Sequence, residues 1–301
     1  MVEGSWGAAE RRVLAHASGP LLVLGGAGTG KTSLLIELLA RATASARPAL
    51  ALCLTRQAAS DVRDRVVRQL GETTRQPSAM TLHAFCLQVM SRFGSDAAGA
   101  PALLTAPEQE FRIRELLAGL PHGEWPESIA AALGTRSFAR QVRGAVSRVR
   151  QLGLDPGDVA AAGRMADEPS WAALGGFFDH YLDVTDAEGV VDYAELVHRT
   201  RILLERDDVA DAVRRSCGVV FVDEFAEFDP AQHALVRSLV GQAGDMVAFA
   251  DPDTAIYRFR GAHPRPLAEF SRLFGGEVVT LVDGRRCPAP LSDAVARVAR
   301  R

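Results

Sequence analysis

A glycine-rich segment near the amino terminus has the residue types and spacing that bind phosphate groups. The run Gly25-Gly26-Ala27-Gly28-Thr29-Gly30-Lys31-Thr32 fits the pattern GxxxxGK[ST] and, with Ser33, opens an apolar segment of helical character. Its glycines let backbone N–H groups surround phosphate oxygens, while Lys31 would reach the β and γ phosphates and Thr32 would bind Mg²⁺. Lys31 is the one lysine among 34 basic residues, which argues against the alternative of a glycine-rich turn without function.

Two acids follow a second apolar run, in a position that suits hydrolysis of a bound nucleotide. The run Val219–Val222 leads directly into Asp223 and Glu224. At the carboxyl end of a parallel strand, Asp223 can hold Mg²⁺ and Glu224 can polarise the attacking water as a general base. An ordinary strand end with a solvated turn is the alternative, and the phosphate loop argues against it. The glutamate beside the aspartate predicts hydrolysis and not binding alone.

Five short apolar runs predict the parallel strands that would position these residues. Helical patterns separate most of the runs, as in βαβ units, but a long stretch without strand signals separates the second run from the third. The predicted fold class is therefore α/β, a P-loop NTPase sheet domain interrupted by an inserted all-helical subdomain. The runs are Pro20–Gly25, Pro48–Leu54, Gly218–Val222, Met246–Ala250 and Val278–Val282.

The predicted boundaries divide the chain into three segments. Residues 1–94 and 206–301 would form the sheet domain, and residues 95–205 would form the helical insertion. Turns rich in glycine and proline separate the helices expected in the insertion. These helices are Pro107–Ala118, Ser137–Leu152, Ser170–Asp183 and Asp192–Glu205.

Composition and charge exclude several other classes of protein. The net charge of the 301 residues is −3, so the chain is not basic overall, although a local basic face is compatible with this value. Its apolar runs are short and no secretory leader pattern is visible, so no association with a membrane is expected. The cysteines are far apart, which argues against a disulfide framework or a zinc finger and predicts a cytoplasmic protein. They are Cys53, Cys86, Cys217 and Cys287.

Several motifs, in order along the chain, resemble those of UvrD/Rep-type superfamily 1 DNA helicases. The sequence DEFAEFDPAQ at 223–232 is similar to their DEFQDTDPxQ signature, and ADPDTAIYRFRGA at 250–262 is similar to GDPDQSIYxFRGA. TLHAFC at 81–86 and LTRQAA at 54–59 resemble two further segments of the family, T-x-H-S-F and TFTNKAA. The helical insertion and the arginine- and alanine-rich composition also resemble the A subunit of actinobacterial AdnAB helicase–nucleases.

The resemblance implies a RecA-like motor lobe 1A, formed by residues 1–94 and 206–301, interrupted by a helical subdomain 1B at 95–205. It implies an ATP-driven 3′-to-5′ helicase or translocase of DNA repair or recombination, acting on single-stranded DNA or a 3′-tailed duplex. Taken alone, the spacing of Tyr257 and Phe259 favours core packing, and the alternative for His83 is a satisfied interior position. The residues that the resemblance places on DNA are Thr55, His83, Phe85, Tyr257, Phe259 and Arg260.

The resemblance also implies further contacts to ATP, and here the sequence departs from the family pattern. Glu10 takes the place of the glutamine that reads adenine, and Thr254 that of the glutamine near the γ-phosphate. Arg286 keeps the position of the γ-phosphate arginine, while Ala226 and Arg285 replace a glutamine and the tyrosine that stacks on adenine. We therefore expect phosphate chemistry to be retained and its coupling to DNA to be weaker.

The family needs a second RecA-like lobe to close the ATP cleft. The sequence ends at Arg301, shortly after Arg286, so the second lobe is expected in cis or from a partner subunit. This chain alone is not expected to unwind DNA. Two functions stay open: the N-terminal half of a working helicase, and a degenerate, non-catalytic DNA-binding subunit of a helicase–nuclease. An unrelated P-loop kinase is a third alternative, but it would not explain the motif around Tyr257.

A run of arginines in the insertion predicts a basic face. Between Glu127 and Asp155 there is no acid. Arg136, Arg140 and Arg143 recur at i, i+4 and i+7 and therefore share one side of a helix, and Arg148 and Arg150 follow them. Such a face would contact DNA phosphates, and an ordinary solvated helix face is the alternative.

Overall fold

The chain divides into two compact units. The computed structural model describes residues 6–71, 77–94, 101–120, 123–242, 244–253, 265–282, 284 and 297. One unit comprises Met1–Phe85 and Leu204–Arg301, and the other comprises Cys86–Leu203. The predicted segments were 1–94, 95–205 and 206–301. Their assignment to subdomains 1A and 1B stays a prediction. Within the described residues, no helix has the length and apolar character needed to cross a bilayer.

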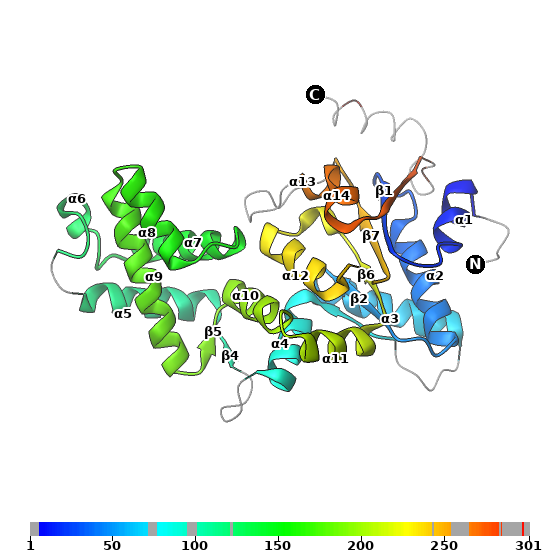
Figure 1. The fold of residues 1–301 in the computed structure, drawn as a ribbon, viewed down its shortest axis with the longest axis horizontal. Coiled ribbons are helices and arrows are strands. Elements are labelled where there is room, and N and C mark those ends of the chain that lie inside the picture. The colour runs from blue at the N-terminus through cyan, green and yellow to red at the C-terminus, as the bar shows by residue number, and fades with distance from the viewer. Residues whose placement is uncertain are drawn as a thin grey trace. The chain divides into compact units, whose positions relative to one another are not determined.

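The first unit is built on a six-stranded sheet in which every strand pairing is parallel. The strand order is β3-β2-β6-β7-β1-β8. In Figure 1 the blue strand β1 lies beside the orange strand β7, which is distant from it in the sequence. The strands are β1 (Pro20–Gly25), β2 (Ala49–Cys53), β3 (Ala79–Thr81), β6 (Val219–Val222), β7 (Met246–Ala250) and β8 (Glu277–Leu281). This sheet confirms the predicted α/β fold class.

The strands form where apolar residues run without interruption. All five residues of β7 are buried, and so are Leu21, Leu22 and Val23 of β1. Such runs are typical of parallel strands covered on both faces, and each of the five predicted runs contains or closely overlaps one observed strand. The sixth strand, β3, was not predicted, because its three residues are too few to display a pattern.

Helices connect the strands of this unit. After β1, helix α2 buries Leu34, Leu35 and Leu39 in the main hydrophobic core beneath the sheet. After β2, Thr55 caps α3 by accepting a hydrogen bond from the Ala58 N–H at 3.1 Å. The helices are α1 (Ala8–Leu14), α2 (Lys31–Ala44), α3 (Arg56–Leu70), α11 (Asp207–Cys217), α12 (Pro230–Val240), α13 (Arg265–Ala268) and α14 (Phe270–Phe274), and α4 (Leu82–Phe93) begins in this unit.

Gly218 marks a close approach between the starts of β2 and β6. Its φ of +59° lies in the region that residues with a side chain seldom adopt. A Cβ atom added there would lie 2.0 Å from the carbonyl oxygen of Pro48. That same oxygen accepts a hydrogen bond from the Val219 N–H at 3.2 Å, so the backbone cannot simply move away. Glycine at this position therefore allows the two central strands to meet.

We expect Gly218→Ala to lower the free energy of unfolding by more than about 2 kcal/mol, because backbone strain and a clash with a carbonyl act together. Gly19→Ala is the matched control: φ is +83° there, but no atom lies within 4 Å of the added Cβ. That variant should lose only about 1–2 kcal/mol, the cost of the left-handed backbone. Urea unfolding of both variants measures the difference. Equal losses would show that the contact with Pro48 is unimportant.

The second unit is helical, as expected of the insertion. Four observed helices match the predicted ones, and α8 was not predicted although Asp155 and Pro156 are typical of a helix start. A two-stranded pairing of β4 (Ala102–Leu103) with β5 (Val190–Val191) completes the unit. The helices are α5 (Ala106–Gly119), α6 (Glu127–Ala130), α7 (Arg136–Gln151), α8 (Pro156–Met165), α9 (Pro169–Ala187) and α10 (Tyr193–Leu203).

The arginines of α7 in the second unit do not all lie on an exposed basic face, although the sequence had predicted that they would. Arg150 is only 4% exposed, and its Nε donates to Glu195 Oε2 at 2.5 Å, while its Nη1 pairs with Asp155. The placement of Arg150 on a DNA-facing surface was therefore wrong, because a buried arginine is retained by its carboxylate partners. Arg136 and Arg140 are exposed, but both donate to the carboxylate of Glu110, which partly neutralises them.

Candidate nucleotide-binding site

The glycine-rich loop joins β1 to α2 and makes a tight turn. Backbone φ is 80° at Gly28 and 96° at Gly30, which only glycine adopts without strain. The Thr29 hydroxyl closes the turn by donating to the Gly26 carbonyl oxygen at 2.9 Å. Gly30 is the N-cap of α2, and neither a side-chain cap nor an acid in the first turn occupies that end. The first N–H groups of α2 and the helix dipole are therefore available to an anion.

Lys31 places a positive charge inside this loop. Its side chain is largely buried, and Nζ donates to the carbonyl oxygens of Gly25 at 2.7 Å and Gly26 at 3.0 Å. The Oδ2 atom of Asp251 lies 3.8 Å from the same nitrogen. The loop and one carboxylate thus hold the ammonium group at the end of β1, where the sequence predicted that it would meet phosphate.

Asp223 and Glu224 directly follow β6, which lies next but one to β1 in the sheet. Burial raises the pKa of Asp223, and the positive charge of Lys31 opposes that shift. Glu224 has a left-handed backbone, with φ 49° and ψ 45°, which is uncommon outside glycine and marks a constrained position. Burial, and then the charge of Asp223, raises the pKa of the Glu224 carboxyl group. A raised pKa brings this carboxylate closer to the proton affinity that a general base needs.

Asp251 is a site residue to which the sequence analysis gave no role. It directly follows β7, is 4% exposed, and accepts a hydrogen bond from the Asp253 N–H at 3.0 Å. The signal for it was present, because Met246–Ala250 is an apolar run that ends in an acid, as Val219–Val222 is. The same strand-end argument that singled out Asp223 would have found Asp251.

Some of the other residues predicted to bind the nucleotide lie within the described part of the chain, and some lie outside it. The run from Gly25 to Ser33 forms the loop and the first turn of α2. Within the described part of the chain, the half-buried Thr32 hydroxyl makes no hydrogen bond, so it is available as an oxygen ligand. Glu10 is buried in α1 at 3% exposure. Thr254 and Arg286 lie outside the described residues, and their roles stay predictions.

Two of the residues predicted to contact DNA, Thr55 and His83, lie shortly after the ends of strands. Thr55 follows β2 and is exposed, although its hydroxyl oxygen already caps α3. His83 is half-buried at the start of α4, and burial lowers the pKa of its imidazole to about 4, so the ring is neutral at pH 7. Phe85 is only 4% exposed. Tyr257, Phe259 and Arg260 lie outside the described residues, and contact of this whole group with DNA stays a prediction.

All these segments meet one edge of the sheet. Because every strand is parallel, the loop after β1 and the acids after β6 and β7 share the carboxyl edge with Thr55 and His83, after β2 and β3. Ligands of open parallel sheets bind at this edge. The strand order brings the phosphate loop, Asp223 and Asp251 to the ends of three adjacent strands, β1, β6 and β7, and places Thr55 and His83 after β2 and β3, which lie beyond β6.

Comparison with known proteins agrees with this arrangement. The model of the UvrD/REP helicase N-terminal domain matches residues 6–275. ATP-dependent DNA helicase UvrD1 of Mycobacterium tuberculosis is 30% identical over 285 residues, which cover 87% of this chain and 35% of that protein. DNA helicase II of Escherichia coli is 26% identical over 95% of this chain and 39% of its own length. The ATP-dependent DNA helicase Rep of Escherichia coli is 26% identical, over 88% and 38% respectively.

The chain thus spans between about one third and two fifths of the length of these relatives. The match to the domain model covers both units and includes the phosphate loop and the strand ends that carry Asp223, Glu224 and Asp251. With sequence motifs, sheet and domain match in agreement, the chain belongs to the UvrD/REP helicase N-terminal domain family.

Proposed function

We propose that this chain is the N-terminal motor portion of an ATP-dependent 3′-to-5′ DNA helicase or translocase that serves DNA repair or recombination. The observation that carries the proposal is the position of Lys31. It is buried in the phosphate loop that follows β1, and β1 lies next but one in the sheet to β6, the strand that ends before Asp223 and Glu224. A loop that binds phosphate next to a carboxylate with a raised pKa has the parts that hydrolysis of a phosphoanhydride requires.

The residues of the site fit ATP and Mg²⁺. The uncapped first turn of α2 and the Lys31 ammonium suit the phosphates, and the oxygens of Thr32 and Asp223 are hard ligands of the kind that Mg²⁺ prefers. Among the described residues, no three side chains of His, Cys, Asp or Glu gather as a metal site, so phosphate oxygens and water would complete the coordination. When bound, Mg²⁺ neutralises charge on the phosphates.

Each residue then has a defined task. Lys31 and the N–H groups of α2 hold the phosphates, and Lys31 would exchange its bonds to the loop carbonyls for bonds to phosphate oxygens. Glu224 accepts a proton from the water that attacks the γ-phosphorus, while the bond from that phosphorus to the β–γ bridging oxygen breaks and ADP leaves. Asp251, 3.8 Å from Lys31, keeps the lysine positioned at the loop. Translocation further requires a second RecA-like lobe, supplied in cis or by a partner subunit.

The decisive test is ATP hydrolysis by the full-length parent protein, with and without single-stranded DNA. A working motor is expected to hydrolyse ATP faster when the DNA is present and to move toward the 5′ end of the bound strand. DNA binding without any stimulation of hydrolysis would instead support the second function, a degenerate motor subunit that holds DNA for a partner. The departures from the family pattern motivate that alternative, and they are Glu10, Ala226, Thr254 and Arg285.

A further expected result concerns the arginines that share one side of α7. Arg140→Ala combined with Arg143→Ala should weaken DNA binding, because both side chains belong to the predicted basic face. Loss of two phosphate contacts would reduce the slope of log affinity against log salt by about 1.4 for a single strand. The control is Arg112→Ala combined with Arg206→Ala, which removes the same charge from arginines paired with single carboxylates. Identical slopes for the two double variants would return α7 to an ordinary solvated face.

A further inference from the structure

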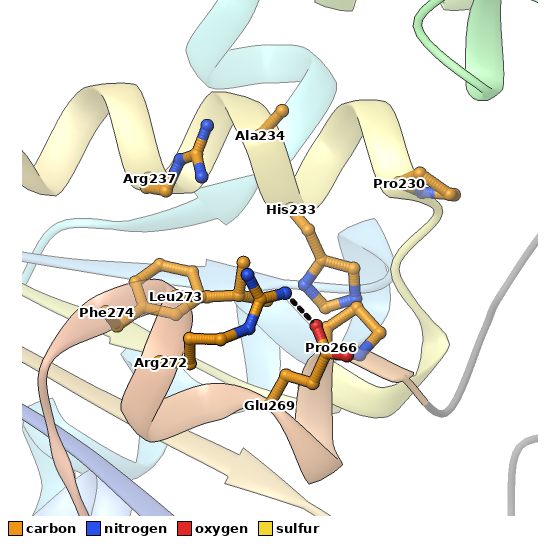
Figure 2. A pocket seen from close by; sticks show the side chains of 9 residues that line it. All are labelled: Pro230, His233, Ala234, Arg237, Pro266, Glu269, Arg272, Leu273 and Phe274. Carbon is orange, nitrogen blue, oxygen red and sulfur yellow. Dashed lines mark hydrogen bonds and ion pairs between the residues drawn. The ribbon is translucent and has the colours of Figure 1, made fainter.

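A cavity of about 320 Å³ lies in the sheet-containing unit, between α12 on one side and α13 with α14 on the other (Figure 2). None of its lining residues belongs to the nucleotide site. Its walls are mostly apolar and include Pro230, Ala234, Pro266 and Leu273. Apolar walls of this kind suit the body of an aromatic side chain, and the O–H or N–H of a buried tyrosine or tryptophan still needs a hydrogen-bond partner.

His233 is the buried polar group of this cavity. It is 5% exposed, and Figure 2 shows it pointing from α12 toward Pro266 and the Glu269–Arg272 pair. Its ring packs edge-on against Phe225, with centroids 4.4 Å apart. Neither ring nitrogen has a partner that satisfies hydrogen-bond geometry. Burial lowers the pKa of His233 to about 3, against a smaller opposing influence of the Phe228 backbone, so the imidazole is neutral at pH 7.

The chemistry of the neutral His233 ring defines which hydrogen-bonding group a ligand must supply. A neutral imidazole has one N–H donor and one nitrogen that can only accept. The Phe228 carbonyl, which is the nearby backbone group, can only accept, so it suits the donor nitrogen. The other nitrogen is an acceptor without a donor, and an unsatisfied buried acceptor is costly. A ligand that completes His233 must therefore bring an N–H or O–H group into the cavity.

The rim of the cavity carries an unbalanced positive charge. Arg272 forms an ion pair with Glu269, as the dashed line in Figure 2 shows. Arg237 is exposed, and it makes no hydrogen bond or ion pair within the described part of the chain. The rim thus offers one free guanidinium group, which favours a ligand with a carboxylate next to the part that enters the cavity.

We propose that this cavity binds an acidic peptide segment of a partner protein, with one tyrosine or tryptophan side chain inserted between α12 and α14. The ring would fill the apolar space, its O–H or N–H would donate to His233, and a neighbouring acidic residue would pair with Arg237. A nucleobase fits less well, because its edge carries several hydrogen-bonding groups and the cavity offers one buried acceptor. The site is independent of the proposed motor activity.

The test is an NMR titration of the ¹⁵N-labelled chain with the peptide acetyl-Asp-Asp-Tyr-Asp-Asp-amide. We expect shifts of amide signals in α12 and α14. The same peptide with phenylalanine in place of tyrosine should bind about threefold to tenfold more weakly, since it leaves the His233 acceptor unpaired. His233→Phe should abolish this preference for tyrosine. Arg237→Glu should remove binding of the acidic peptide, whereas Arg215→Glu, an exposed position on α11, should not.

Several results of this titration would contradict the proposed peptide site. It is overturned if millimolar peptide leaves the α12 and α14 signals unchanged, or if the tyrosine and phenylalanine peptides bind equally well. Shifts of those signals with AMP but not with the peptide would identify a nucleotide site instead. If His233→Phe does not fold, the comparison of Arg237→Glu with Arg215→Glu still decides, because both are surface positions.

Discussion

Glu224→Gln is expected to leave ATP affinity unchanged and to slow hydrolysis by about 10²- to 10⁴-fold, the usual contribution of a positioned general base. Glutamine has nearly the shape of glutamate, and it tolerates the left-handed backbone at this position about as well. The amide cannot accept a proton from water at neutral pH, so the loss falls on the chemical step. Nucleotide binding by fluorescence and single-turnover hydrolysis by the full-length protein separate the two quantities.

The pH dependence of hydrolysis provides a second measurement of the same residue. Burial and the charge of Asp223 raise the pKa of Glu224, and a base is active only when deprotonated. The rate should therefore fall on the acid side at a higher pH than an ordinary glutamate would produce. In Glu224→Gln the part of this acid limb that belongs to Glu224 should be absent, because an amide does not titrate.

Asp253→Asn is the matched control for Glu224→Gln. Asp253 is an exposed acid close to the same sheet edge, and its backbone N–H, which the substitution keeps, is what contacts Asp251. Its hydrolysis rate should stay within severalfold of the unchanged protein. If Glu224→Gln and Asp253→Asn reduce the rate equally, the effect is general electrostatics and Glu224 is not the base.

The secondary structure around the site was predicted correctly where local sequence determines it. The phosphate loop follows an apolar run and starts a helix, and β1 and α2 form from these same residues. Asp223 follows a run of apolar residues that becomes the buried strand β6. In both cases adjacent residues decide the backbone, so a short window contains the information.

The parts that escaped prediction depend on residues far apart in the chain. The strand-end pattern could have marked Asp251 as a site residue, but only the strand order, which places β7 beside β1, makes it the partner of Lys31. Arg150 was assigned to the surface because its partner Glu195 lies on another helix, α10. Spacing along one helix identifies a face but does not say what packs against it. His233 precedes the buried Val236 and Val240 by three and seven residues, so helical spacing places it on the buried face of α12, but that spacing does not show that its ring nitrogens lack partners.

Lys31→Met is expected to weaken ATP binding by about 100-fold or more, because a charged donor to phosphate contributes about 1.5–3 kcal/mol per hydrogen bond and Lys31 would make at least one to each of two phosphates. Methionine keeps the unbranched chain in its buried position and removes only the charge. Lys31→Arg restores the charge but not the shape, since the planar guanidinium does not fit between two loop carbonyls 2.7 and 3.0 Å from Nζ. Binding that survives in Lys31→Met would contradict the role given to the loop.

The uniqueness of Lys31 makes the same prediction testable at the side chain itself. Labelling the chain with ¹³C-lysine would give a single side-chain signal, because no other lysine is present. Without nucleotide, the ammonium group is held by Gly25, Gly26 and the Asp251 carboxylate. ATP with Mg²⁺ should shift this signal, since phosphate oxygens replace the carbonyls as acceptors, and adenosine should not. A shift of equal size with adenosine would mean that the loop responds to the base and not to phosphate. A shift that occurs only with ATP would mean that Lys31 contacts the phosphate groups.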